Sequence, residues 1–503
     1  MIRFSLWRQH VARYPLTAVL TGLLIAQIIA SLQVYLSNRA LYHTLVSIRD
    51  AGYLTVPTEA AMDRLQDMAP AVWGGLFFTL SAGAGISLVS LAAVWIWDRL
   101  FRRSRRSLIF LLLVWAGSMT AVNWEGWSPL TTAYFALIPI GVFRVAVSGK
   151  SARTVRDHWF LTGIHAAAIG LLVCLWGSQM GKDLFVNIRD RLLLSNPIGA
   201  VVSDFYYQYT LYPAQVFKSL NQKTLKTCSL DGVGNSRLKE LLAEKLLAYD
   251  YLPIKGGERV DLEISGSGEG LIFGHRGEAI LKTTAKDFLS APHRALEQFS
   301  LRTDKNRFFR GFSYFGLLIG FPLTLYLFAY TLVMVLATLF FQLNKARVLA
   351  DILCVVIGIC LLMPLLAGHH KAAETVCLSE RLTSDPWQER VAALKWMEDN
   401  GGDVSRFPAY RQLLSSRRIQ ERYWLAKAMG VSRAQNTYED LMQLLDDPCP
   451  SVVCMALQSL GRRGDSGAIQ EILRRIRASD HWYVQWYGYR ALKRLGWKQS
   501  ASE

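Results

Sequence analysis

The 503-residue sequence is poor in charge, especially acidic charge. Charged residues make up 19% of it, whereas soluble domains contain roughly 25%. Lysine and arginine (56) outnumber aspartate and glutamate (39). The seven cysteines include no Cys-x-x-Cys pair and no zinc-ligand spacing. His-Glu-x-x-His, Gly-x-Ser-x-Gly and Walker A patterns are also missing. The low charge argues against an ordinary soluble protein, and we predict no catalytic residue, cofactor site or metal site.

Hydrophobic residues, by contrast, make up 51% of the sequence and gather in long runs. A run of about twenty residues is enough to cross a bilayer. The first run is longer than the apolar core of a signal peptide, so we expect it to be retained. We predict a membrane domain over residues 1–180 with five spans and two further spans over 311–368. The first five spans are 15–36, 70–97, 108–122, 130–147 and 158–180.

An arginine cluster between the second and third runs predicts the orientation of the chain, because arginine beside a membrane helix stays in the cytoplasm. The cluster comprises Arg99, Arg102, Arg103, Arg105 and Arg106. Basic loops recur at 144–156 and 345–347. The N-terminus is therefore predicted inside, with a polar outer loop over 37–69. Seven spans would place the C-terminal part outside the inner membrane of a bacterium.

Few ionisable residues interrupt the apolar runs. His165 lies within the fifth run, and an ionisable group at membrane depth is a candidate functional residue. We find no charged partner for it in the other runs and expect an interhelical hydrogen bond. Glu125 is expected to be a solvated loop residue. This scarcity of acids and bases argues against ion-coupled transport.

A polar insert, residues 181–310, separates the fifth and sixth runs and is predicted outside the membrane. Its tyrosine-rich start, 189–213, predicts an amphipathic helix at the membrane surface, a groove for an acyl chain or glycan, or packing against the membrane domain. Further on, 236–249 has helical periodicity. Short strands are expected at 259–265, 270–274 and 279–284. The insert therefore contains a small α/β module, in which the glycine-rich stretch between two strands predicts a hairpin loop rather than a phosphate site.

The C-terminal part, residues 377–498, repeats itself with a period of about 31–35 residues, which is typical of helical solenoids. The pattern Ala-Leu-x-x-Leu-Gly occurs at 456–461 and 491–496, and variants occur at 393–397 and 425–430. Asp-Pro pairs at equivalent places suit helix starts.

This part resembles the HEAT-repeat family, in particular the short bacterial repeats related to phycobilin lyases. The closest stretch is 444–465, although Val453 and Gln485 stand where the family usually has arginine. The resemblance implies an α-solenoid that binds a protein partner and carries no catalytic residues. We thus expect a mainly α protein: a polytopic membrane helical bundle of about seven spans, a small α/β extracytoplasmic module and a HEAT-type α-solenoid.

Arginine and aromatic residues in the last two repeats form the candidate partner-binding surface. It comprises Arg462, Arg463, Arg474, Arg475, Trp482, Tyr483 and Trp486. Such a mixture can bind nucleic acid, but a location outside the membrane excludes that. An anionic partner protein or anionic lipid headgroups fit better, and core aromatics under a solvated basic face are the other interpretation. In an oxidising compartment, Cys228 and Cys377 could form a disulfide.

These features predict an integral membrane scaffold rather than an enzyme, with the HEAT repeats as a platform for a protein partner. The alternative is a subunit of a transport or envelope lipid/glycan-handling complex whose helices form a substrate path.

Overall fold

The computed structural model describes residues 15–148, 159–181, 183–254, 260–267, 270–366 and 378–500. The described chain is mainly helical and contains a five-stranded sheet. It divides into two compact units. The first comprises Met1–Leu36, Met68–Leu192 and Lys305–His369, and the second comprises Ser37–Asp67, Leu193–Asp304 and His370–Glu503.

Among the described residues, six helices are long and apolar enough to cross a membrane. They are α2 (Pro15–Asp50), α4–η2–α5 (Met68–Phe78, Thr79–Gly83, Ala84–Arg99), α6 (Arg105–Val122), α7 (Pro129–Ser148), α15–η5–α16 (Arg307–Phe315, Gly316–Gly320, Phe321–Ala337) and α17 (Leu343–Leu366). Helix α8 (Trp159–Gly177) contains a shorter apolar stretch, Gly163–Gly177. Length and composition are compatible with a multi-pass membrane protein.

Helix α2 extends well beyond the predicted first span. The sequence analysis expected a polar loop from residue 37, but the helix continues without a break to Asp50. Its outer part contains Leu, Ala, Tyr and Arg and neither proline nor glycine, so nothing in the chain ends the helix where the apolar run stops. The loop is therefore reduced to short helices, α3 (Glu59–Asp63) and η1 (Arg64–Gln66).

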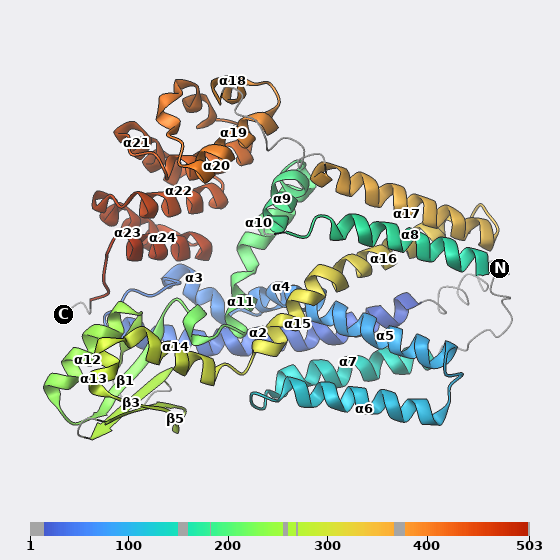
Figure 1. Cartoon of the computed structure of the whole chain (residues 1–503), viewed down its shortest axis with the longest axis horizontal. Helices are drawn as coiled ribbons and strands as arrows, with labels where there is room; N and C mark the ends of the chain where they lie inside the picture. Colours follow the sequence, from blue (N-terminus) through green and yellow to red (C-terminus); the bar gives the residue numbers. More distant parts are fainter. Residues whose placement is uncertain are drawn as a thin grey trace. The chain divides into compact units, whose positions relative to one another are not determined.

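Two π-helical turns, η2 and η5, bring two apolar helices of the first unit into backbone contact. A Cβ atom on Gly320 would lie 2.9 Å from the backbone nitrogen of Gly85, and one on Gly316 would clash with the carbonyl oxygen of Ser81. Small residues allow membrane helices to approach this closely. Gly85 in the second apolar run thus lies against Gly316 and Gly320 of η5. In the same unit, α8 lies beside α17, and α6 beside α7 (Figure 1).

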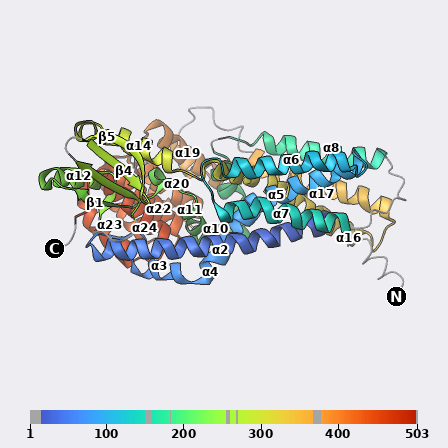
Figure 2. The same cartoon turned by 90° about the horizontal axis from the view of Figure 1, so that it is seen from below.

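The sheet of the second unit has the order β2-β1-β3-β4-β5. Its strands are β1 (Lys226–Val233), β2 (Tyr251–Pro253), β3 (Leu262–Ser267), β4 (Gly270–His275) and β5 (Glu278–Thr284). The first three pair in parallel and the last three antiparallel. Helices α12 (Ser236–Ala248), α13 (Ala285–Ser290) and α14 (Pro292–Thr303) lie against the sheet (Figure 2).

The hairpin expected at the glycine-rich stretch is present, since Ser267 on β3 pairs with Gly270 on β4. Strands β1 and β2 were not predicted. The first half of β1 is almost continuously buried, because it is flanked by strands on both sides and by α12. A strand in such a position lacks the alternation of polar and apolar residues that sequence patterns detect.

In the C-terminal part, four longer helices pack in a row, each against the next (Figure 1). They are α19 (Trp387–Asn400), α20 (Ile419–Met429), α22 (Pro450–Arg463) and α24 (Trp482–Arg494). Shorter helices lie between or before them: α18 (Leu378–Thr383), α21 (Gln435–Gln443), α23 (Ile469–Ala478), and the 3₁₀ turns η7 (Val404–Arg406), η8 (Pro408–Leu413), η9 (Leu444–Asp446) and η10 (Ser466–Ala468). The repeated Ala-Leu pattern forms the buried side of this row, as Leu425, Ala456 and Leu492 are fully buried.

The remaining elements belong to the start of the insert. They are α9 (Leu184–Asn187), η3 (Ile188–Leu193), α10 (Pro197–Tyr209), α11 (Leu211–Val216) and η4 (Leu220–Gln222). Asn196 caps α10 by accepting a hydrogen bond from the Gly199 nitrogen at 2.8 Å. The exposed side chains of α10 include Ile198 and Val201, and the amphipathic membrane-surface helix stays a prediction.

The glycine contact between η2 and η5 gives a direct test of helix packing. Gly316→Ala should destabilise the protein by about 1–3 kcal/mol, because the new methyl group pushes the two backbones apart. Gly311→Ala is the matched control, since a Cβ there meets open space. Thermal unfolding in lipid nanodiscs should show a lower Tm for Gly316→Ala alone. Equal Tm values for both variants would contradict the close contact.

Candidate functional site

Buried and half-buried arginines link successive repeats of the C-terminal row. Arg390 on α19 binds Glu421 with an Nε–Oε1 distance of 2.8 Å. Arg422 on α20 binds Asp447 through two bonds, of 2.5 and 3.1 Å. The two carboxylates are almost completely buried, and charge-assisted bonds of this kind are stronger than neutral ones. These arginines therefore stabilise the row.

Each of these arginines also donates to a backbone carbonyl six residues earlier, Arg390 to Ser384 and Arg422 to Ser416. In the last repeat, Gln485 takes over this bond by donating to the Ser479 carbonyl at 2.6 Å. Glutamine at position 485, where the family usually has arginine, therefore still makes the hydrogen bond to the carbonyl six residues earlier. It replaces a charged side chain with a neutral one that has both a donor and an acceptor.

Gln485 uses these groups to bind the segment that follows α2. Its amide nitrogen donates to Thr58 Oγ1 at 2.7 Å, and its oxygen accepts from the Thr58 nitrogen at 3.1 Å. Both residues are buried. Gln499 makes a similar pair of bonds with the backbone of Leu54, at 3.1 and 2.9 Å.

Helix α24 also contacts the insert. Asp250 accepts a hydrogen bond from the Tyr489 hydroxyl at 2.6 Å and forms an ion pair with Lys493 at 2.9 Å. The Tyr483 hydroxyl lies 2.9 Å from Thr210 Oγ1. The Trp482 ring packs edge-on against Tyr212 at 5.1 Å. The last repeat thus holds together three distant stretches of the second unit.

The structure separates the predicted surface residues into buried and exposed ones. Arg463 and Trp482 are buried, at 5% exposure each. Arg463 donates to the Ser432 and Ala434 carbonyls and to Thr437 Oγ1. Neither side chain is available on the outer surface. The partner-binding role of the group stays a prediction.

Arg462 and Arg474 are exposed and lie in salt bridges with Glu398 and Glu471, respectively. Arg475 is half-buried between Glu471 and Asp446. Hydrogen bonds from Arg474 and Arg475 lower the pKa of Glu471 below its ordinary value. These salt bridges place carboxylates next to the arginines and neutralise part of their charge. The surface therefore carries less net positive charge than the sequence suggests.

The aromatic members of the predicted surface are bound within the second unit. Tyr483 contacts the ring of Tyr207 at 5.2 Å, and Trp486 packs against Tyr487 and beneath the Arg490 guanidinium. Burial lowers the pKa of the neighbouring His481. The tyrosine-rich start of the insert thus covers aromatic residues of α24.

The arginine cluster of the first unit lies at the turn between α5 and α6. Arg102 and Arg103 have positive φ angles, 47° and 59°, and Arg103 pairs with Asp98 at 2.6 Å. Arg105 and Arg106 begin α6 and are exposed, and Arg99 ends α5.

The candidate disulfide stays a prediction. Cys228 is a free, fully buried thiol on β1, and Cys377 lies outside the described residues.

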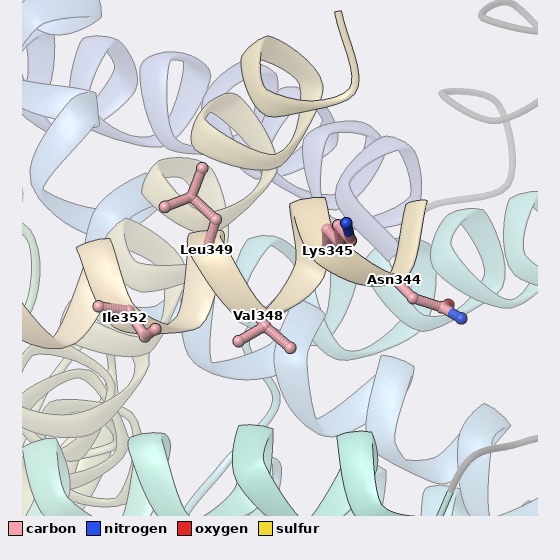
Figure 3. A pocket seen from close by; sticks show the side chains of 5 residues that line it. All are labelled: Asn344, Lys345, Val348, Leu349 and Ile352. Carbon is pink, nitrogen blue, oxygen red and sulfur yellow. The ribbon is translucent and has the colours of Figure 1, made fainter. Parts of the chain in front are cut away.

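His165 has a charged partner, Asp351, in another apolar helix. Its Nδ1 atom lies 2.6 Å from Oδ1 of Asp351 on α17. The expected interhelical hydrogen bond is therefore present, but the statement that His165 has no charged partner in the other runs was wrong, because the single carboxylate of the last apolar run was overlooked. That lone acid, two turns into a run of 24 helical residues, was the signal that could have found the pair. Residues Asn344, Lys345, Val348, Leu349 and Ile352 line a shallow hollow on the same helix (Figure 3). Asp351 is not among them, and this largely apolar hollow is built from one helix.

Residues 407–493 match the family model of HEAT repeats. The match runs from the residue before η8 to within α24 and confirms the resemblance of the C-terminal part. Comparison with curated proteins and with solved structures finds no match. The C-terminal part of the chain thus carries HEAT repeats, a class of repeat that generally mediates protein–protein interaction.

Arg463 and Arg462 are adjacent and provide a matched pair for a stability test. Arg463→Met should cost about 1–3 kcal/mol, because buried carbonyl and hydroxyl acceptors lose their donor. Arg462→Met should cost less than about 1 kcal/mol, as an exposed salt bridge contributes little. Scanning fluorimetry of the full chain in nanodiscs measures both. A similar loss in the two variants would show that Arg463 has no special structural role.

Proposed function

We propose that this protein is a non-catalytic integral membrane scaffold that presents its HEAT repeats to a protein partner. The observation that carries the proposal is the HEAT match at 407–493 in a chain that also has six helices able to cross a membrane. HEAT repeats supply an extended surface for protein binding, and the apolar helices keep that surface at a membrane.

The fact that the second unit is built from three separate chain segments supports seven spans rather than six. Its three parts, Ser37–Asp67, Leu193–Asp304 and His370–Glu503, form one compact unit, so they must share one side of the membrane. An even number of crossings must then separate each part from the next. The six long helices alone would leave three crossings between the first two parts, whereas counting α8 makes four. Two crossings, α15–η5–α16 and α17, separate the second part from the third.

The exposed arginines at the turn after α5 support a cytoplasmic location for that turn. In this orientation the second unit, with the HEAT repeats, lies outside the inner membrane of a bacterium. Exposed Arg406, Arg417 and Arg433 contribute positive charge to its surface there, whereas Arg462 and Arg474 are paired with glutamates. An acidic protein surface is the partner that such a face attracts, and nucleic acid is not expected outside the membrane.

A subunit of a transport or lipid-handling complex is the second candidate. The pair of His165 and Asp351 favours it, because paired ionisable groups at membrane depth mark ion and proton pathways in many membrane proteins. The scarcity of ionisable groups no longer argues against this function.

Cysteine labelling tests the orientation. An impermeant maleimide should label Asp465→Cys in intact spheroplasts, and should label Arg105→Cys only after the membrane is opened. The unsubstituted chain gives the background from its own cysteines. Labelling of both positions from one side would require an even number of spans between them and would overturn the seven-span arrangement.

Site-specific photo-crosslinking tests the scaffold function. A crosslinking amino acid at exposed Arg474 should give one discrete adduct with a partner protein in cells. The same amino acid at buried Trp482 should give only intramolecular products, because Tyr212 covers that ring. Adducts with lipid alone at position 474 would instead favour the second candidate.

A further inference from the structure

The pair formed by His165 and Asp351 lies between three apolar helices of the first unit. Asp351 on α17 is 3% exposed, and within the described part of the chain its carboxylate bonds to His165. The imidazole on α8 is less buried, with 35% of its side chain exposed. The two residues lie six and eight positions after the starts of their helices, which corresponds to about 9 and 12 Å along the axis. The pair therefore lies in the apolar part of both helices, toward the end of α17 that also carries Lys345 and Arg347.

Two tyrosines of α16 complete the surroundings of the pair. The Tyr330 ring lies 4.7 Å from the His165 ring, and the Tyr326 ring 6.0 Å. The hydroxyl of Tyr326 is buried and has no hydrogen-bond partner in the described part of the chain. A buried polar group without a partner is costly. This hydroxyl is therefore able to donate a hydrogen bond to a charged group that moves within reach of it.

The other ionisable groups near the pair are few. On α17, Arg347 lies one helical turn before Asp351 and makes no ion pair in the described chain, and buried Cys354 follows three residues later. Lys345 is exposed at the start of the helix. On α8 the described side chains add only Cys174, and on α16 the two tyrosines are the titratable groups. Arg347 is thus a permanent positive charge one turn away, while His165 and Asp351 are the groups in contact whose charge can change with proton binding.

We propose that His165 and Asp351 form a proton-binding site in the membrane-spanning part of the protein. With one proton bound, the pair is electrically neutral overall, either as imidazolium and carboxylate or as imidazole and carboxylic acid. Without it, the Nδ1–H group of a neutral imidazole still donates to the carboxylate, and the pair carries one negative charge. The proton enters at Nε2, the ring nitrogen that the carboxylate does not occupy, because Asp351 itself is covered.

Charge at this depth is coupled to helix packing. A net charge in a low-dielectric environment is costly unless further donors approach it. Loss of the proton therefore favours closer contact with available donors such as the Tyr326 hydroxyl, and uptake of the proton removes that requirement. The site connects the proton concentration at one membrane face to the packing of α8 against α16 and α17. This function goes beyond a passive scaffold.

Nitrogen NMR of the full chain in nanodiscs tests the proposal with the proton itself as the probe. The protein is labelled with ¹⁵N-histidine, and His165→Gln assigns the His165 signals by their loss. In the unsubstituted protein, these signals should titrate between pH 5 and 9. In Asp351→Asn, which keeps the shape and a hydrogen-bonding oxygen, the midpoint should shift by at least one pH unit. Removal of the exposed histidine in His43→Gln should leave the His165 titration unchanged.

A His165 signal that is constant from pH 5 to 9 would overturn the proposal. An unchanged midpoint in Asp351→Asn would also overturn it, because the carboxylate would then have no part in proton binding. If Asp351→Asn does not fold, Asp351→Glu replaces it: the longer carboxylate should move the midpoint, and an unmoved midpoint counts against the site.

Discussion

Helix α24 is the junction on which the second unit depends. Gln485 binds Thr58 through two hydrogen bonds, and Asp250 accepts from Tyr489 and pairs with Lys493. These polar groups are buried or partly buried, so loss of any partner would leave a donor or acceptor unsatisfied at a cost of about 1–3 kcal/mol. One helix of the last repeat thus fixes the positions of two segments that precede it by hundreds of residues.

The same contacts solve a general problem of repeat proteins. A repeat at the end of a row has one face without a neighbour and needs a cap. Here the insert and the segment after α2 cover that face, with Tyr212 against Trp482 and Thr58 against Gln485. The residues that looked like a partner-binding surface divide accordingly: Trp482 and Arg463 serve the interior, while Arg462 and Arg474 remain outside. Aromatic residues near the end of a repeat array are therefore weak indicators of a binding face.

Sequence patterns could predict the features that depend on local periodicity. The apolar runs, the repeat pattern around Leu457 and Leu492, and the hairpin at Gly270 are of this kind. Features that depend on tertiary contacts could not be predicted: the burial of β1, the partner of Gln485 and the covering of Trp482. Asp351 is an intermediate case, because its position in an apolar run was visible but its pairing with His165 depends on how α8 and α17 pack. The continuation of α2 to Asp50 was missed because the edge of a hydrophobic run was taken as the end of a helix.

The bond between Thr58 and Gln485 joins residues 427 positions apart. A ribosome adds about 5–20 residues per second, so Thr58 emerges tens of seconds before its partner exists. During that interval the segment after α2 and the insert lack the helix that joins them. The second unit can close only when the last repeat has been made. Truncation near the C-terminus would therefore leave the segment after α2 without its binding partner on α24, so a defect at the end of the chain would appear as disorder near its beginning.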